Sequence, residues 1–467
     1  MSEAGPARPL RRAIALAAAA LALACADPGL ERAISQAEAS AAAARAGDVD
    51  ALYDFMRRTH PALFHHNSRE KIEAEVARLR ASAPRLSWPE FVVGVQRVLK
   101  LVGDAQTSLS PLPETGPGFD TRLPLLVETF GDGTYVIGAD ARYRDAVGAR
   151  LVAVSGRPLE EVRARLAAFW PHENRTWVLR WTPLLLRRPG YLVGSGIAEG
   201  DDVAAPAVFR VRLASGALRD FAVIPVPATA DEQAQRASWV YARDEAGLAR
   251  PTRLHGGDAA FDFVELPEQR TVYAVYRQCE DGERESVAAF AERLFAFVES
   301  HDALKLAIDL RENGGGGDEK KNEALLSALE RSKLNRPGGL FVLIGRRTFA
   351  AAQSFATQAE RRTQALFAGE PSGSAPNHYG EPRPFRLPSS GLSVTVATKL
   401  QQDSDAADAR FNLPPDTPAW GTFDDWQRGR DAALEAVLRY RPTANSRPFD
   451  PRERWRDGRG RRKSDGR

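Results

Sequence analysis

Cysteine, histidine and methionine are scarce in this chain of 467 residues, which holds two, seven and two of them. Two cysteines cannot form a disulfide scaffold or a multi-cysteine zinc or iron–sulfur site. The histidines are scattered, and no His-Glu-x-x-His motif pairs them for zinc. We therefore expect neither a metal site nor a cofactor.

A strong charge of one sign is also missing from most of the chain. The net charge is +3, but residues 441–467 carry +6 and residues 1–24 carry +2, so residues 25–440 carry about −5. A nucleic-acid-binding domain needs its basic side chains on a folded face, so we expect no nucleic-acid partner. Residues 441–467 contain Pro and Gly but almost no aliphatic side chains, which predicts a disordered basic tail.

Long hydrophobic runs are absent apart from one at the N-terminus. Arg11 and Arg12 precede twelve apolar residues, 13–24. At about 1.5 Å per residue, this run is too short to span about 30 Å of hydrocarbon. Its charged start and small-residue end are typical of a secretory signal peptide, which we expect over residues 1–24.

The end of that run leaves three interpretations open. Ala22 and Ala24 form the small pair of an ordinary cleavage site, which would give a secreted protein. The sequence Ala-Leu-Ala-Cys also resembles the box of bacterial lipoproteins, which implies a lipid on Cys25 after cleavage. The third interpretation is an Ala-rich helix with no targeting role. We expect an exported, periplasmic or cell-envelope protein whose contact with a membrane, if any, is a lipid anchor at Cys25.

The remaining chain divides by its pattern into a helical region, a β-rich unit and an α/β core. Residues 30–117 have helical periodicity, with a Ser-Trp-Pro-Glu capping box that begins one helix. Residues 118–228 form short alternating runs between tight turns, which predicts a small β-rich unit with one or two helices. Residues 229–258 are predicted to be a linker. Residues 259–440 alternate strand and helix, which predicts helices that cover a sheet.

A glycine-rich turn follows one of the strands predicted in this core. The strand at 304–310 leads into Arg-Glu-Asn and then four glycines, 314–317. Such glycines allow backbone N–H groups to approach a ligand closely. A phosphate loop would place Lys and Ser or Thr next, whereas here Asp318 and Glu319 follow and would repel phosphate. The turn therefore favours an oxyanion-binding site over a phosphate site, although the run taken alone would more often be a flexible surface loop.

Other motifs accompany this turn in a fixed order along the chain. They are Gly-Asp-Ala-Gln-Thr at 103–107, Asp-Leu-Arg-Glu-Asn-Gly-Gly at 309–315, Thr-Phe-Ala-Ala-Ala-Gln-Ser at 348–354, Gly-Glu at 369–370 and Pro-Asn-His-Tyr-Gly at 376–380. This set resembles the tail-specific protease family of C-terminal processing serine peptidases. The resemblance spans roughly residues 45–440. It implies a multidomain α/β (α+β) fold, with an N-terminal helical region, a PDZ-like unit over 118–228 and a ClpP/crotonase-like core over 259–440.

When the family's catalytic residues are matched to this sequence one by one, several of the catalytic groups are missing. The family's nucleophilic serine stands in Thr-Phe-Ser-Ala-Ala, where this chain has Ala350. Its general base is the histidine of Asp-x-His-Thr, where this chain has Gln106. Members with a Ser–Lys dyad carry a lysine that residues 372–376 lack. A methyl group forms no acyl intermediate, and an amide takes no proton near neutral pH.

The oxyanion-binding parts are kept in the sequence. The resemblance implies that the backbone amides of Gly314, Gly315, Gly316 and Ala351 form the peptide-binding and oxyanion-binding site. Loss of the nucleophile in serine hydrolases lowers turnover by about 10⁶, while the oxyanion hole and binding alone retain about 10³ over water. We expect a chain that binds peptides or protein C-termini and cleaves them very slowly.

Replacements for the missing groups are few. Ser354 lies one helical turn beyond Ala350, which moves its oxygen by about 5–6 Å along the helix axis. We expect a packing or capping serine there, with a relocated nucleophile as the weaker alternative. His378 is a possible base, but its Pro-Asn-His-Tyr-Gly context predicts a loop.

Other polar residues are expected to have structural roles. His60 is predicted at a helix end or on the surface, and the Arg346–Arg347 pair at a solvated edge rather than in a carboxylate clamp. Asp408 aligns only loosely with an acidic partner that some family members keep. Cys279 follows a strand pattern and is expected to be a structural thiol.

Three functions therefore compete. The first is a catalytically impaired peptidase homologue that binds peptides or protein C-termini, and we favour it. The second is an active serine-type endopeptidase with a relocated nucleophile. The third is an envelope scaffold that adds a partner's peptide strand to a sheet edge of the β-rich unit. Relatives of this fold also bind small hydrophobic ligands, but nothing in this sequence indicates that role.

Overall fold

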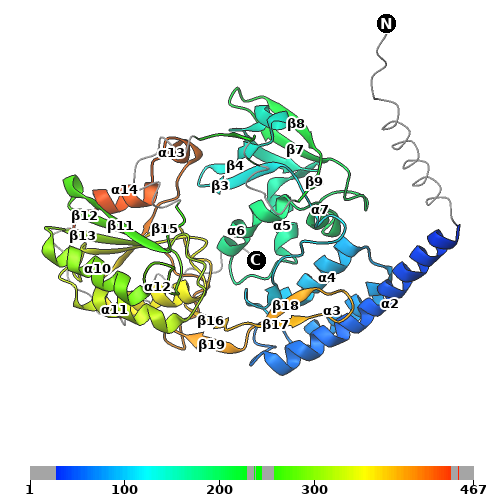
Figure 1. The fold of residues 1–467 in the computed structure, drawn as a ribbon, viewed down its shortest axis with the longest axis horizontal. Helices are drawn as coiled ribbons and strands as arrows, with labels where there is room; N and C mark the ends of the chain where they lie inside the picture. Colours follow the sequence, from blue (N-terminus) through cyan, green and yellow to red (C-terminus); the bar gives the residue numbers. More distant parts are fainter. Residues whose placement is uncertain (1–27, 229–235, 237, 244–256, 443–450, 452–467) are drawn as a thin grey trace, which may run out of the picture.

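The computed structural model describes residues 28–228, 236, 238–243, 257–442 and 451 (Figure 1). The predicted signal peptide, Cys25, most of the predicted linker and nearly all of the predicted tail lie outside these residues. Among the helices that are described, none combines the length and the apolar character needed to cross a membrane. The fold is mixed α/β with a helical N-terminus, as the sequence predicts.

Within the described residues, the N-terminal region contains three α-helices. They are α2 (Pro28–Thr59), α3 (Arg69–Ser82) and α4 (Trp88–Lys100) (Figure 1). The predicted capping box begins α4, because the Ser87 side chain accepts from the Glu90 N–H and Glu90 accepts from the Ser87 N–H. Phe91, Val95 and Val98 recur at helical spacing and are fully buried, so α4 presents one apolar face to the interior.

A segment from the C-terminal part of the chain returns to these helices. Strands β17 (Arg383–Arg386) and β18 (Ser393–Val396) form a sheet with β1 (Ser108–Leu109). Both carboxylate oxygens of Asp48 in α2 accept backbone N–H groups from residues 389 and 390, at 2.8 and 2.7 Å. The predicted core over 259–440 is therefore not one contiguous body, because part of it pairs with the N-terminal region.

The β-rich unit is a seven-stranded sheet with more helix than the sequence predicts. Its strands are β3 (Leu125–Phe130), β4 (Gly133–Ala139), β5 (Arg150–Val154), β6 (Arg157–Pro158), β7 (Ala207–Arg212), β8 (Leu218–Val223) and β10 (Val240–Tyr241). Three helices rather than one or two lie between β6 and β7: α5 (Leu159–Ala167), α6 (Arg175–Leu186) and α7 (Pro189–Gly194). Outside the sheet, β2 (Thr121–Arg122) pairs with β9 (Val226–Pro227).

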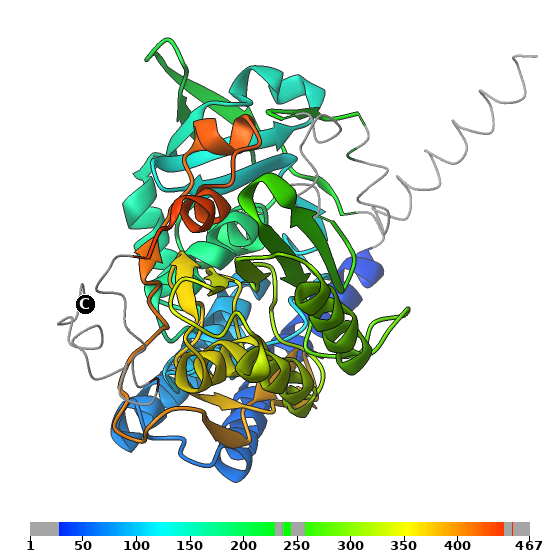
Figure 2. The ribbon, with the colours of Figure 1, turned by 90° about the vertical axis from the view of Figure 1, so that its left-hand side faces the viewer.

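The core is a six-stranded sheet between two layers of helix (Figure 2). Its order is β11 (Phe261–Leu266), β12 (Thr271–Tyr276), β13 (Lys305–Asp309), β14 (Leu340–Ile344), β15 (Leu366–Gly369) and β20 (Thr417–Pro418). The strands from β12 onward are parallel. Residues of β12, β13 and β14 are all buried, as expected for a sheet covered on both faces.

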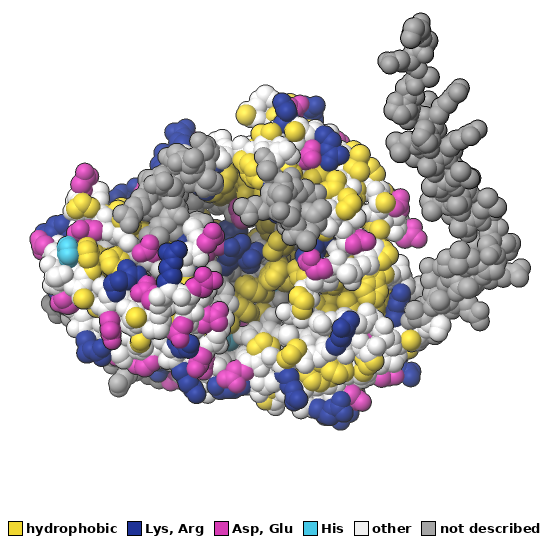
Figure 3. Space-filling model, viewed as in Figure 1, with side chains coloured by type: hydrophobic (Ala, Val, Ile, Leu, Met, Phe, Trp, Pro, Cys, Tyr) yellow, Lys and Arg dark blue, Asp and Glu magenta, His cyan; other side chains and the backbone are white. Residues whose placement is uncertain are grey.

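Helices α10 (Val287–Ser300), α11 (Asn322–Arg331) and α12 (Ala351–Arg362) cover one face of this sheet, and α14 (Ala432–Arg439) covers the other. Because the strands follow one another in chain order, right-handed crossovers place the connecting helices on one side. The turns after β13 and β14 therefore lie side by side at the carboxyl ends of neighbouring strands. Figure 3 shows a hollow between the half that carries this sheet and the half that carries the β-rich unit.

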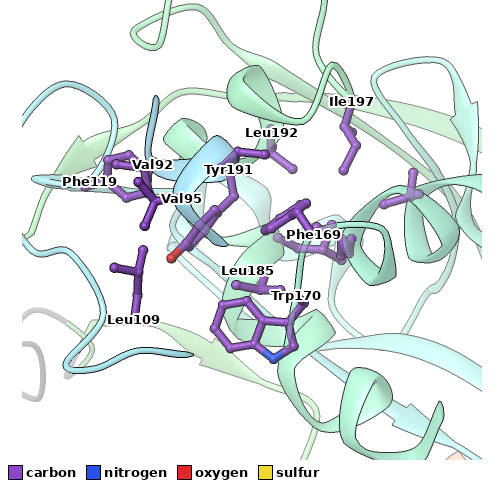
Figure 4. Close-up of a cluster of buried hydrophobic side chains, with 14 of the residues drawn as sticks. Val92, Val95, Leu109, Phe119, Phe169, Trp170, Leu185, Tyr191, Leu192 and Ile197 are labelled. Atoms are coloured by element: carbon purple, nitrogen blue, oxygen red, sulfur yellow. The ribbon is translucent and has the colours of Figure 1, made fainter. Parts of the chain in front are cut away.

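A large cluster of apolar side chains joins the N-terminal helices to the β-rich unit (Figure 4). Tyr191 of α7 lies at its centre, 5.0 Å from the ring of Phe119 and 5.7 Å from the ring of Phe169. Val95 of α4 belongs to the same cluster, as does Phe349 from the turn before α12. This cluster therefore anchors the beginning of α12 to the rest of the molecule.

Candidate active site

The glycine-rich turn after β13 is held by a buried asparagine. The Asn313 side chain accepts from the Gly315 N–H at 2.9 Å and donates to the Tyr276 carbonyl at 2.9 Å. Gly315, Gly316 and Gly317 have φ values of +91°, +82° and +59°, a region that L-residues rarely adopt. The turn is thus fixed at Asn313 and the buried Gly315, while Gly314, Gly316 and Gly317 are exposed.

A sharp turn joins β14 to α12, and Ala350 stands at its strained point. Ala350 has φ +50° and ψ −124°, and holding a non-glycine residue in such a region costs about 1–3 kcal/mol. Thr348 fixes the turn, because its hydroxyl accepts from the Gly345 N–H at 3.0 Å and donates to the Leu310 carbonyl at 2.9 Å. A strained strand-to-helix turn is how hydrolase folds present a nucleophile, but here it presents a methyl group.

The two turns are in direct contact. A Cβ placed on Gly315 would lie 2.8 Å from the Ala350 Cβ and 3.0 Å from the Ala351 nitrogen. The Phe349 N–H also donates to the Asn313 carbonyl at 3.3 Å. The structure therefore brings together the glycines and the alanines that the sequence singles out.

The donors of this site are fewer than the sequence suggests. The Gly315 N–H is used by Asn313, which leaves the amides of Gly314, Gly316 and Ala351. Ala351 is the first residue of α12, so its N–H has no acceptor within the helix. These amides, with the positive end of a twelve-residue helix, favour a carboxylate or an oxyanion.

The loop that carries Gln106 has its own buried support. Asp104 accepts from the Gln106 and Thr107 N–H groups at 2.9 and 2.6 Å, and its other oxygen lies 3.2 Å from His60 Nε2. His60 Nδ1 accepts from the Ala62 N–H at 3.1 Å, so Nε2 carries the proton and donates to Asp104. His60 follows the end of α2, which confirms the predicted helix-end position rather than the surface alternative, and it is 6% exposed.

Gln106 itself lies beside the end of strand β16 (Asn377–Gly380). Its Nε2 is 3.5 Å from the position that a Cβ on Gly380 would take. Its carbonyl accepts from the Thr395 hydroxyl of β18 at 2.9 Å. The loop shape is therefore held independently of the side chain that stands at the base position.

Glu173 links the loop of Gln106 to the loop that follows β15, and no sequence pattern singles it out. Its Oε2 accepts from the Ala375 N–H at 2.6 Å and the Ser374 hydroxyl at 3.0 Å. Burial raises the pKa of its carboxyl to about 8, and the nearby Asp104 raises it further, while hydrogen bonds from Ala375 and Ser374 oppose the shift. A single Glu among ordinary charged residues carries no sequence signal, because its partners lie about 200 residues away.

The loop at 372–376 has no lysine to serve a Ser–Lys dyad. Ser372 donates to the Ser374 carbonyl at 3.0 Å, and the Gly373 N–H donates to the Thr348 carbonyl at 3.0 Å. Trp177 of α6 stacks on Phe349 with ring centroids 3.9 Å apart. The loop therefore braces the turn of Ala350 and supplies no base.

Ser354 and His378 are both buried behind this turn. Ser354 is 4% exposed, and its Oγ has no hydrogen-bond partner among the described residues. His378 lies in β16, so the predicted loop is wrong, because residues 377–380 pair with β19 (Lys399–Gln402). Its Nδ1 lies 3.1 Å from the Ala375 carbonyl, and burial lowers the pKa of its imidazole despite the nearby Asp403.

Arg346 is not at a solvated edge, and that expectation is wrong. Its side chain is 12% exposed and binds Glu370 through two hydrogen bonds of 2.7 Å. It also donates to Glu128 at 3.2 Å and to the Thr129 carbonyl at 2.9 Å. Its neighbour Arg347 is 41% exposed and pairs with Glu312.

Asp408 is engaged elsewhere, whereas Cys279 lies against the glycine turn, where its N–H donates to the Gly315 carbonyl at 3.1 Å. Asp408 accepts from Arg410 and from the Ser404 hydroxyl, and Arg410 also binds Glu360. This buried ion-pair group shows no contact with the turn of Ala350. Cys279 is fully buried, and burial raises the pKa of its thiol to about 12, which fits the expected structural role.

The comparisons with known proteins are structural ones. No protein-family model matches the chain, and a search of curated proteins finds no match. The structure of mature CPAF is similar, with a TM-score of 0.57 and 12% identity over 85% of this chain and 97% of that chain. Mature CPAF complexed with lactacystin gives 0.54 and 13% over the same shares.

A more distant likeness is to the photosystem II D1 C-terminal processing protease. It has a TM-score of 0.36 and 14% identity over 86% of this chain and 98% of that chain, which is too low to carry an argument. The likeness to CPAF establishes the fold of this chain, in agreement with the fold that the motifs imply. At such low identity it establishes the fold alone.

Proposed function

We propose that this chain is a tail-specific protease homologue that binds peptides or protein C-termini and is impaired in cleaving them. The observation that carries the proposal is Ala350. Its backbone keeps the strained conformation of a nucleophile turn, directly against Gly315, although its side chain is a methyl group. An L-residue adopts such a conformation only when the surrounding structure holds it there.

The binding part of the proposal rests on free backbone donors. The amides of Gly314, Gly316 and Ala351 belong to two adjoining turns that the hydrogen bonds of Asn313 and Thr348 hold in place. Donors that are fixed before binding stabilise a negative oxygen without reorganisation. A peptide carbonyl or a terminal carboxylate supplies such an oxygen.

The impairment follows from the groups present. Ala350 cannot attack a carbonyl carbon, and Gln106 cannot accept a proton. A relocated nucleophile at Ser354 is disfavoured because that side chain is 4% exposed, so an extended peptide has no path to its hydroxyl. His378 is buried as well.

The scaffold alternative is weakened at one sheet edge. Strand β3 is an outer strand of the β-rich sheet, but Arg346 donates to its Thr129 carbonyl. The Gly131 N–H beyond its end donates to the Gly421 carbonyl at 2.9 Å. A partner strand added along β3 would have to displace these contacts.

Export also remains part of the proposal. A signal peptide over residues 1–24 would deliver the chain to the periplasm or cell envelope, and a lipid on Cys25 would tether it there. Mass spectrometry of the protein from a bacterial host tests this point. A mature chain that begins at Cys25 with an added diacylglyceryl group supports the anchor, and retention of residues 1–24 contradicts export.

The functional test combines binding and turnover. Fluorescein-labelled peptides with free C-termini are titrated into the purified chain and followed by anisotropy, and the same peptides are assayed for cleavage. We expect saturable binding without turnover above a heat-inactivated sample. Turnover that survives in the chain and disappears in Ser354→Ala would overturn the impairment, and absence of any binding would overturn the peptide-binding role.

A further inference from the structure

Glu280 lies directly against the glycine turn at 314–317. A Cβ placed on Gly316 would lie 3.6 Å from the Glu280 Oε1, and one placed on Gly317 would overlap with the Glu280 Cβ. The N–H of the preceding residue, Cys279, donates to the Gly315 carbonyl at 3.1 Å. The segment after β12 therefore places a carboxylate next to the turn whose amides hold a peptide oxygen in the proposed function.

The Glu280 carboxylate has no cation of its own. It is exposed, and it forms no hydrogen bond or ion pair with any residue that the structure describes. Arg284 and Lys320, on the two segments that meet at the glycine turn, form no ion pair with it. Four neighbouring carboxylates, by contrast, are paired: Asp281 with Lys321, Glu285 with Arg293, Glu312 with Arg347 and Glu319 with Lys399.

An unpaired carboxylate acts on the charge of a ligand that binds beside it. An oxygen held by the amides of Gly314, Gly316 and Ala351 brings the adjoining residues of an extended peptide close to Glu280, since consecutive Cα atoms are about 3.8 Å apart. A lysine or arginine on one of these residues is attracted to this carboxylate, whereas an acidic side chain is repelled. Glu280 therefore discriminates between peptides that the amides alone would bind equally.

We propose that Glu280 is a specificity-determining residue, which selects peptides with a lysine or arginine close to the residue whose oxygen lies on the glycine turn. This inference rests on the proposed peptide binding and narrows its ligands to basic peptides. Asp318 directly follows the last glycine, and its carboxylate accepts the Lys320 N–H at 2.9 Å. It adds a second negative charge to the same turn, so the effect of Glu280 is reinforced.

The test compares peptides that differ in one side chain. Fluorescein-labelled pentapeptides carry Lys, Ala or Glu at one of their last three positions, and each is titrated into the full chain at low ionic strength and followed by anisotropy. At one position or more, we expect the Lys peptide to bind about fivefold more tightly than the Glu peptide, with the Ala peptide between them. The preference should shrink in about 1 M salt, where the screening length falls to about 3 Å.

Two substitutions assign the preference to one carboxylate. Glu280→Gln should abolish it, and Glu280→Lys should reverse it, while both variants keep the affinity of the wild type for the Ala peptide. The matched control is Glu268→Lys, which changes the net charge by the same amount as Glu280→Lys. Glu268 is exposed and lies in the short 3₁₀ helix Pro267–Gln269, before the start of β12. The six residues of that strand separate it from the glycine turn by about 20 Å, so the control should keep the preference for lysine.

The outcomes separate this inference from the proposed function. If no peptide binds, the proposed function fails, and the selectivity fails with it. If peptides bind but Lys and Glu are equivalent at all three positions, only the role of Glu280 is overturned. A preference that persists in Glu280→Gln, or that disappears equally in Glu268→Lys, would also overturn it. Loss of the Ala peptide from Glu280→Gln would show that this side chain supports the turn itself and does not act through its charge.

Discussion

The turn of Ala350 and other buried polar residues of the molecule differ in how many of their polar groups form hydrogen bonds. Around the turn, Thr348 and Asn313 bond to backbone groups on both sides. Elsewhere among the described residues, buried side-chain atoms without a hydrogen-bond partner include Glu173 Oε1, Gln353 Oε1, Ser354 Oγ and Asp403 Oδ2. Buried polar groups are usually bonded, so the comparison separates a backbone frame with satisfied hydrogen bonds from side chains that lack such partners.

This difference shows what holds an active-site shape. The frame depends on backbone hydrogen bonds and on glycines at positive φ, and none of these involves the side chain at position 350. In the proposed function, the chemistry depends on two side chains, at 350 and 106, which bear little of the frame's stability. In the proposed function, the reacting groups are therefore replaced while the geometry of the turn is kept.

The largest expected effect is a gain of activity. If the frame is preserved, Ala350→Ser combined with Gln106→His should restore hydrolysis of an activated ester by about 10³-fold or more over the starting chain. The single variants serve as matched controls and should show far smaller gains, because nucleophile and base act as a unit. A double variant as inactive as the starting chain would mean that the frame is not catalytically competent.

The protonation of the buried Glu173 carboxyl is tested through the pH dependence of the unfolding free energy. Its pKa is raised from the usual 4.5 to about 8, so the folded chain holds a proton that the unfolded chain has lost. Stability therefore falls as pH rises through this window. Glu173→Gln should match wild type near pH 5 and exceed it near pH 9, by no more than about 5 kcal/mol, since one pKa unit corresponds to about 1.4 kcal/mol.

Urea unfolding at the two pH values measures this difference. Glu161→Gln is the control, because that carboxylate of α5 is 42% exposed and its pKa is lowered by Arg165 and Arg157. Its stability relative to wild type should be unchanged between pH 5 and pH 9. A difference for Glu173→Gln that is the same at both pH values would show that the carboxyl is ionised in the fold.

The contact between the glycine turn at 314–317 and the turn of Ala350 is tested by adding one methyl group at Gly315. Gly315→Ala would place a Cβ 2.8 Å from the Ala350 Cβ at a φ of +91°. We expect a loss of about 3 kcal/mol in unfolding free energy and loss of peptide binding. Gly156→Ala, at φ +77° with no atom within 4 Å, should lose about 1–2 kcal/mol and keep binding. Equal losses in both variants would contradict the close packing.

The smallest expected effect is the change in unfolding free energy when the backbone strain at Ala350 is relieved. Ala350→Gly should raise the unfolding free energy by about 1 kcal/mol, because glycine adopts positive φ without strain. Ala352→Gly, a buried position inside α12, should lower it by about 1 kcal/mol or more. A loss for both variants in urea unfolding would show that the turn is not strained.

Much of the backbone structure around the site could be predicted because it depends on residues that are neighbours in the sequence. The capping box of α4, the strand before the glycines and the strand before Ala350 all follow from patterns a few residues long. The glycines at 314–317 indicated their own turn. The fold class followed from the alternation of strand and helix together with the family resemblance.

The parts that were wrong or missed depend on distant partners. No local pattern predicts that His60 is buried, because its hydrogen-bond partner Asp104 lies 44 residues away in the sequence. The burial of Arg346 likewise depends on Glu128 and Glu370, which are distant in the sequence. The return of β17 and β18 to the N-terminal helices likewise has no local signal. Glu173 looks like any surface carboxylate until the fold brings residues 374 and 375 to it.

A fluorophosphonate probe, which reacts covalently with an activated serine, gives the most direct test of the central claim. Wild type, Ser354→Ala and the Ala350→Ser/Gln106→His double variant are labelled side by side. A preserved frame without reacting groups predicts labelling of the double variant and none of the other two. Labelling of wild type that disappears in Ser354→Ala would contradict the account, because it would show a working nucleophile elsewhere in the site.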